Sequence, residues 1–304
     1  MKKYISFIIV SGVLLVATLI FTVSITQKLK NYHSKKEQVA ELLSIENRMG
    51  DAWEWIPVSF LNPGDEKMEQ KSELEAKANL YYSSAVKEGW MMLATIASYL
   101  CLTLFLYRKS EEYQRAMGMA FIFSALAFLY LGLNAPLMEI EAYVDDFGIS
   151  MDLSFAQPEL GIEGRVYALY QMKSVLGVIG FLYTGGNIPV AIIILIFSIV
   201  FPMIKLVSSL VVFIWPGSKY SKNAILVIEK LGKWSMADVF VAAVFLAFFS
   251  FSNMSLGVET GSSALIGLYF FVAFVVFSIF SGYFLKRVVI KSITKKTEAD
   301  YTPA

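Results

Sequence analysis

Six long apolar stretches restrict this chain to one broad kind of fold. Each is long enough to cross roughly 30 Å of hydrocarbon as an α-helix. Because a spanning segment must satisfy its backbone hydrogen bonds internally, these stretches predict an all-α polytopic membrane protein with six transmembrane helices. The stretches run over about 5–26, 89–107, 116–138, 187–214, 234–254 and 263–285.

Composition supports this class and excludes several others. The chain of 304 residues is 57% hydrophobic, which is too apolar for a soluble protein of this size. With Cys101 as the one cysteine and His33 as the one histidine, we expect no disulfide, no zinc ribbon and no multi-histidine metal site. A net charge of +1 gives no reason to expect nucleic-acid binding. We expect no cofactor and no metal.

The distribution of Lys and Arg predicts the orientation. The short loops 139–186 and 255–262 hold Arg165 and Lys173 alone, and segment 27–88 is too long for its charges to count. Both termini are therefore predicted to be cytoplasmic, with the first stretch an uncleaved anchor. Fourteen basic residues flank the other side: Lys2, Lys3, Arg108, Lys109, Arg115, Lys219, Lys222, Lys230, Lys233, Lys286, Arg287, Lys291, Lys295 and Lys296.

Residues 1–115 are predicted to form a two-helix transmembrane hairpin with a helical periplasmic insertion over 27–88. The insertion is rich in Lys, Glu and Gln, and VAELLSIENRM places apolar residues at helical spacing. A second helix begins near GDEKMEQKSELEAK and runs into the next span. The insertion is either a helical hairpin above the membrane that contacts a partner or a solvated spacer.

Residues 116–288 are predicted to form a four-helix transmembrane domain with a small α/β cap over 139–186. Alternation of apolar and polar residues in MEIEAYVDDFGISMDLSFAQPELG indicates short strands. RVYALYQMKSVLGVIGFLYTGGN then predicts an amphipathic or re-entrant helix, closed by Gly185 and Gly186. Residues 289–304 form a cytoplasmic tail that we expect to be disordered.

Lys205 lies inside the apolar segment 187–215. Burying its charge costs roughly 3 kcal/mol on insertion scales. Ser198, Pro202, Lys205 and Ser209 fall along one helical face. Pro202 frees the carbonyl of Ser198, so we expect a kink. Lys205 either reaches the headgroups or a structural carboxylate, or lines a polar cavity that holds an anionic head group.

The segment LGKWSMADVF, 231–240, contains a second polar group. Ser235 and Asp238 have the spacing of a helix N-terminal capping box. Asp238 is also predicted to lie at a depth in the membrane from which it can pair with Lys205. One carboxylate can both cap the helix and form this pair. The residues predicted to have a structural role in this motif are Gly232, Lys233, Trp234 and Met236.

A third polar group lies in YALYQMKS, 167–174. Its members Tyr170, Gln171, Lys173 and Ser174 are predicted at the outer membrane surface. They belong either to an ordinary interfacial helix with aromatic belt residues or to a gate or docking site above the cavity.

Motifs of hydrolases and nucleotide-binding proteins are missing from the sequence, including HExxH, GxSxG and the glycine-rich phosphate loop. A Ser–Lys arrangement is the one intramembrane hydrolase chemistry left open. We therefore expect no enzyme, and an energy source other than nucleotide hydrolysis, such as the proton gradient.

FPMIKLVSSLVVF, followed by EKLGKWSMADVFVAAVF and preceded by YQMKS, resembles the paraquat-inducible protein A family over about 116–288. The resemblance implies a bacterial inner-membrane protein that passes phospholipid between the inner membrane and a partner with mammalian-cell-entry (MCE) domains. Larger members carry duplicated modules with Cys-x-x-Cys zinc ribbons, and this chain has one module without them. The resemblance places the polar core of the family on Ser198, Pro202, Lys205, Trp234, Ser235 and Asp238.

These observations predict a component of a phospholipid transport system that handles lipid in a polar-lined cavity. A membrane-anchored sensing protein that uses the 27–88 hairpin is an alternative of a different class. An ion or small-solute transporter is the third possibility. Such a pore usually needs more charged residues than Lys205 and Asp238, although two can suffice.

Overall fold

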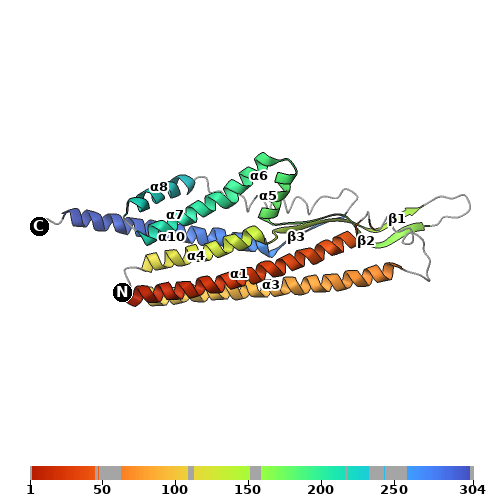
Figure 1. Ribbon diagram of the computed structural model, residues 1–304, viewed down its shortest axis with the longest axis horizontal. Helices are drawn as coiled ribbons and strands as arrows, with labels where there is room; N and C mark the ends of the chain where they lie inside the picture. The colour runs from red at the N-terminus through yellow and green to blue at the C-terminus, as the bar shows by residue number, and fades with distance from the viewer. Residues whose placement is uncertain are drawn as a thin grey trace, which may run out of the picture.

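The computed structural model describes residues 2–44, 47, 63–108, 113–150, 159–215, 218–232, 243 and 259–301. These residues are mostly helical and include a three-stranded sheet at one end of an elongated molecule (Figure 1). Five of the described segments are long and apolar enough to span a membrane. They correspond to five of the six predicted spans, and the sixth, 234–254, lies outside the described residues apart from position 243.

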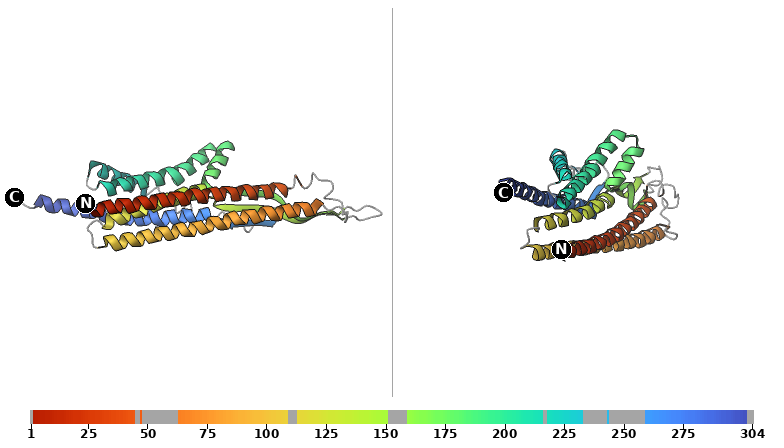
Figure 2. Two further views of the ribbon diagram at one scale, coloured as in Figure 1. Left: turned by 60° about the horizontal axis from the view of Figure 1, so that its bottom comes forward. Right: turned by 60° about the vertical axis from the view of Figure 1, so that its left-hand side comes forward.

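Two long helices form one side of the molecule. Helix α1 (Lys2–Leu42) and helix α3 (Pro63–Tyr107) run side by side over most of its length (Figures 1 and 2). At 41 and 45 residues, they measure about 60 and 70 Å, roughly twice the hydrocarbon thickness. The helix predicted to run from Gly64 into the second span is therefore present as part of α3.

The seam between α1 and α3 has the spacing of a coiled coil. Buried positions on α1 follow steps of three, four or seven residues, and α3 repeats this pattern. Within the apolar part the seam includes hydroxyl side chains, which allow close approach of membrane helices. The buried seam residues are Thr18, Thr22, Ile25, Leu29, Tyr32, Val39 and Leu43 on α1, and Ala78, Ala85, Met92, Ile96, Tyr99 and Thr103 on α3.

Helix α4 (Tyr113–Asn134) occupies the centre of the bundle and packs along α10 (Ile266–Tyr301). Glycine makes this packing close, because a Cβ on Gly132 would lie 2.9 Å from the backbone of Phe271. A Cβ on Gly118 would collide with the ring of Phe213. Helix α4 also contacts α1, α3 and α7, so it joins the outer layers of the bundle (Figure 2).

A third layer contains α5 (Val175–Thr184), α6 (Ile188–Leu195), α7 (Phe201–Ile214) and α8 (Lys219–Gly232). Arg115 at the start of α4 holds the end of α7, since its guanidinium donates to the carbonyl oxygens of Phe213 and Ile214 at 3.1 and 3.2 Å. A cation at a helix C-terminus satisfies carbonyls that have no partner within the helix.

The sheet has the order β2-β1-β3, with β1 (Met138–Ser150), β2 (Glu159–Lys173) and β3 (Glu259–Ala264). Strand β1 pairs antiparallel with both neighbours. The backbone N–H of Tyr167 in β2 donates to the carbonyl of Leu43 at 2.9 Å, so the sheet is joined to the end of α1. The small α/β cap predicted from the sequence is present, and β3 adds a strand that was not predicted.

Two predictions of secondary structure were wrong. The helix predicted from Arg165 onward begins at Val175, because residues to Lys173 pair with β1 as strand β2. The tail expected to be disordered continues as helix to Tyr301. In the first case the alternating pattern of a half-exposed strand was read as an amphipathic helix.

The start of α1 and the end of α10 lie at the same end of the molecule, opposite the sheet (Figure 1). Helix α8 lies toward that end, whereas β3 lies at the sheet.

Candidate functional site

The segment that carries Lys205 is one long helix with an irregular turn. Between α6 and α7 lies the π-helical turn η2 (Ile196–Val200), where the N–H of Phe201 donates to the carbonyl of Ile196. Proline at 202 has no N–H to offer the carbonyl of Ser198, so regular pairing cannot continue through this turn. The irregularity predicted at Pro202 is present, and it takes the form of a π turn.

Three residues of the predicted polar face are buried, and the fourth, Lys205, lies at the edge of this face. Ser198 is 1% exposed and Ser209 is 3% exposed, and Pro202 is buried beside them. Lys205 is half-buried, next to the fully buried Leu206. In the described part of the chain, the hydroxyl of Ser198 has no hydrogen-bond partner. A buried hydroxyl without a partner is costly, so this turn has unused capacity to bind a polar group.

The second polar group cannot be placed. Gly232 ends α8, and Lys233, Trp234, Ser235, Met236 and Asp238 lie outside the described residues. The capping box at Ser235 and the pairing of Asp238 with Lys205 therefore stay predictions.

The third polar group lies on a strand end and a helix cap rather than on one helix. Tyr170, Gln171 and Lys173 belong to β2, where Gln171 pairs with Ile140. Ser174 is the N-cap of α5, and its hydroxyl accepts from the N–H of Gly177 at 3.1 Å.

Tyr170 belongs to a buried polar junction that the sequence did not reveal. Its hydroxyl donates to Glu139 Oε1 at 2.8 Å, and the hydroxyl of Tyr32 on α1 donates to Oε2 at 3.3 Å. Glu139 is 5% exposed, and Lys36 Nζ lies 3.5 Å from its Oε1. Ser263 of β3 donates to Oε2 at 3.3 Å. One carboxylate therefore ties α1 to all three strands.

Burial of the phenol, followed by the negative charge of Glu139, raises the pKa of Tyr170 well above its usual range. The phenol therefore stays protonated and remains a hydrogen-bond donor at physiological pH. Glu139 is separated from Tyr32, Tyr170 and Ser263 by 107, 31 and 124 residues, so no local motif marks the junction.

A polar cavity of about 410 Å³ lies where α1, the end of α4, β2 and α5 meet. Lys173 and Ser174 from the predicted outer group line it, together with α1 residues that the sequence analysis did not select. Its polar lining includes Thr26, Lys30, His33, Asn134, Lys173 and Ser174. In the part of the chain that the structure describes, no Asp or Glu lines this cavity.

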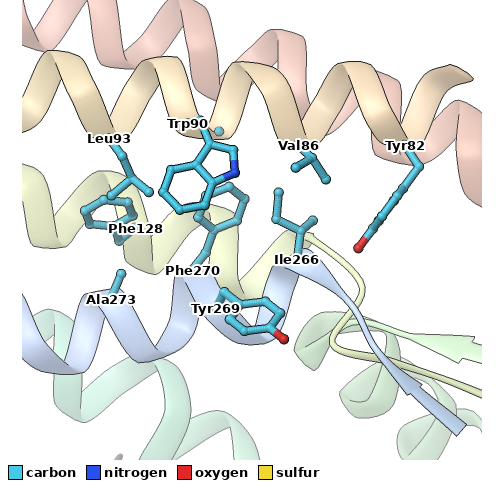
Figure 3. Close-up of a pocket in the computed structure, with 10 residues that line it drawn as sticks. Tyr82, Val86, Trp90, Leu93, Phe128, Ile266, Tyr269, Phe270 and Ala273 are labelled. Atoms are coloured by element: carbon cyan, nitrogen blue, oxygen red, sulfur yellow. The ribbon is translucent and has the colours of Figure 1, made fainter.

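A second cavity, of about 400 Å³, lies between α3, α4 and α10 and is apolar (Figure 3). Trp90 and Leu93 of α3 face Phe270, Tyr269 and Ile266 of α10 across it. Trp90 is 69% exposed and Tyr269 is 63% exposed, so the cavity opens on the outside of the bundle. Its lining has the chemistry of a site for a hydrocarbon chain.

The five apolar segments and the sheet at one end of the bundle define a multi-pass membrane protein. Residues 162–290 match the sequence model of the paraquat-inducible protein A family, which confirms the family resemblance indicated by the sequence. The match extends from β2 into α10 and leaves α1, α3, α4 and β1 outside it. No curated protein and no solved structure matches the chain.

Proposed function

We propose that this protein is an inner-membrane component of a bacterial phospholipid transport system. It crosses the membrane six times with both termini in the cytoplasm, and it binds and passes lipid without catalysing a reaction. Phospholipid enters a cavity lined by Ser198, Lys205 and Ser209, with Ser235 and Asp238 on the following span. Its partner is a periplasmic MCE-domain protein, and its energy source is the proton gradient.

The observation that supports this proposal most directly is the buried hydroxyl of Ser198. It lies in a π turn, within the segment that matches the family model, and has no hydrogen-bond partner among the described residues. Lys205 follows two helical turns later and is half-buried. A hydroxyl without a partner and an ammonium group on one segment form a site for an anionic head group within an apolar bundle.

The apolar cavity beside Trp90 supports the lipid assignment independently. A phospholipid needs hydrocarbon-lined space as well as polar contacts, and this cavity opens on the outside of α3 and α10. Trp90 and Tyr269 are the kinds of side chain that lie at the boundary between hydrocarbon and head groups.

Reconstitution tests the proposal. The purified protein is placed in proteoliposomes under an imposed pH gradient, and transfer of a fluorescent phospholipid to acceptor vesicles is measured with an MCE-domain partner. We expect Lys205→Ala to lose at least tenfold in transfer rate, because the head group loses a charge-assisted contact of about 1.4 kcal/mol or more.

The matched control is Val207→Ala on the same helix, where the side chain is 52% exposed. It should transfer lipid at the wild-type rate. A Lys205→Ala protein that accumulates in the membrane and transfers lipid normally would refute the cavity.

A sensing or docking protein is the second candidate, favoured by the length of α1 and α3. The paired helices extend roughly 30 Å past the membrane if 12–26 and 89–107 lie within it. Deleting 30–86 separates the two functions. Loss of partner capture while the remaining bundle still transfers lipid would assign docking to the hairpin.

A further inference from the structure

We propose that the polar cavity between α1, β2 and α5 binds the phosphate group of a phospholipid in the outer leaflet. Lys30, His33, Lys173 and Ser174 surround this cavity. It forms only where α1 packs beside the segment that matches the family model, so the N-terminal hairpin creates it. The assignment rests on the proposed role in handling phospholipid, and it adds a site separate from Lys205.

The charges around the cavity favour an anion. Lys30 on α1 is exposed and Lys173 at the end of β2 is half-buried, and the described residues that line the cavity include no carboxylate. His33 Nδ1 lies 3.6 Å from a carboxylate oxygen of Glu37, whose side chain is 70% exposed. Two lysines on the wall of one cavity favour an anionic ligand when no carboxylate is among its described lining residues.

Hydrogen-bond donors add to this preference. The hydroxyl oxygen of Ser174 accepts from the N–H of Gly177 at 3.1 Å, so its own proton is available to a ligand. Ser174 is also the N-cap of α5, where helix dipoles favour negative charge. His33 Nε2 lies 3.3 Å from the carbonyl of Met172, which orients the imidazole at the cavity wall.

The surroundings favour a lipid phosphate over a free anion. Helix α5 exposes Leu176 by 42% and Phe181 by 55%, the pattern of a helix that lies in the membrane interface. Lys173 Nζ lies 5.4 Å from the ring centroid of Phe181, so a charged wall and an apolar surface meet at the cavity. The apolar run of α1 ends near Thr26, which places the cavity at head-group depth. At about 410 Å³, it is large enough for a phosphate and its neighbouring glycerol.

Native mass spectrometry of the full chain in detergent tests the site. The probes are phosphatidylglycerol, diacylglycerol with the same acyl chains as a phosphate-free lipid, and inorganic phosphate. The test variant is Lys30→Gln with Lys173→Gln. The matched control is Lys35→Gln with Lys87→Gln, which removes two positive charges from lysines that do not line the cavity.

We expect the test variant to weaken phosphatidylglycerol binding about tenfold or more, because two charge-assisted contacts are lost. Diacylglycerol binding should be equal in all proteins, and the control should bind phosphatidylglycerol like wild type. Equal binding of phosphatidylglycerol by wild type and test variant would overturn the site. Inorganic phosphate that binds with similar affinity and displaces the lipid would overturn the lipid assignment in favour of a soluble anion.

Binding at this cavity and transfer through the Lys205 cavity are measured separately. If Lys205→Ala transfers lipid normally while Lys30→Gln with Lys173→Gln loses phosphatidylglycerol, the Lys205 cavity fails and the outer site stands. If the wild-type protein transfers no lipid but binds phosphatidylglycerol through Lys30 and Lys173, the proposed transport function fails and the outer site stands. If Lys205→Ala slows transfer while Lys30→Gln with Lys173→Gln binds phosphatidylglycerol like wild type, the outer site is refuted and the transport function stands.

Discussion

The hydroxyl of Tyr170 lies 2.8 Å from Oε1 of Glu139, a carboxylate that is 5% exposed. This contact joins neighbouring strands at the centre of a junction that also holds Tyr32 and Lys36 of α1. A carboxylate buried this deeply is tolerated only while donors surround it. The junction therefore fixes how the sheet sits on α1, and with it the walls of the polar cavity nearby.

Tyr170→Phe should destabilise the protein by about 1–3 kcal/mol, because a buried carboxylate loses a donor while the ring packing is kept. Thermal unfolding in detergent measures the change. Tyr183→Phe is the matched control, since Tyr183 is 64% exposed and should change the midpoint little. Equal midpoints for Tyr170→Phe and wild type would show that the contact contributes nothing.

The raised pKa of Tyr170 predicts a loss of stability in alkali. The unfolded phenol ionises near pH 10 whereas the folded phenol stays protonated, so the stabilisation is complete below about pH 10 and falls as pH rises further. The advantage of wild type over Tyr170→Phe should therefore shrink by about 1.4 kcal/mol for each pH unit above 10. Unfolding midpoints of both proteins between pH 8 and 11.5 provide the measurement, and a constant difference would contradict it.

Lys28 and Glu88 should be coupled, since Lys28 Nζ lies 2.6 Å from Glu88 Oε1 and the side chains are 29% and 18% exposed. We expect a coupling of about 1 kcal/mol in a double-mutant cycle of Lys28→Ala and Glu88→Ala. Lys28→Ala should cost more than Lys87→Ala, a control lysine on the exposed side of α3. Additive losses would mean that the pair contributes no net stability.

Gly132→Ala should destabilise the bundle by about 1–3 kcal/mol, because its Cβ would lie 2.9 Å from the Phe271 backbone, which cannot move like a side chain. Gly282→Ala is the control within α10, where nothing lies within 4 Å of the added Cβ. That change should be neutral or slightly stabilising. Unfolding midpoints that shift equally would mean that α4 and α10 are less closely packed at Gly132.

Lys205 and Asp238 are predicted to pair across two spans. Lys205→Met and Asp238→Asn, alone and together, should give losses of lipid transfer that are not additive, because breaking either side removes the same contact. The double variant should then transfer lipid about as slowly as the slower single variant. Additive losses would show that the two residues do not act together.

Regular, local patterns in the sequence were sufficient to predict the helices and the irregular turn at Pro202. Five apolar stretches became helices, and the missing N–H of proline disturbed the pairing of Ser198 as expected. The strand from Arg165 to Lys173 was mistaken for a helix, because its pairing with β1 depends on residues about thirty positions earlier. Glu139, Lys30 and His33 were missed for the same reason, since their partners come from distant parts of the chain.

Helices α1 and α3 continue without a break from the apolar region to the sheet. Paired helices locked by a three-four seam resist bending and twisting far more than a loop does. A protein that binds the end of this helix pair at the sheet can therefore transmit force to the rest of the bundle. A turn or push applied there is transmitted along both helices to the opposite end of the bundle, where α1 begins and α3 ends (Figure 1).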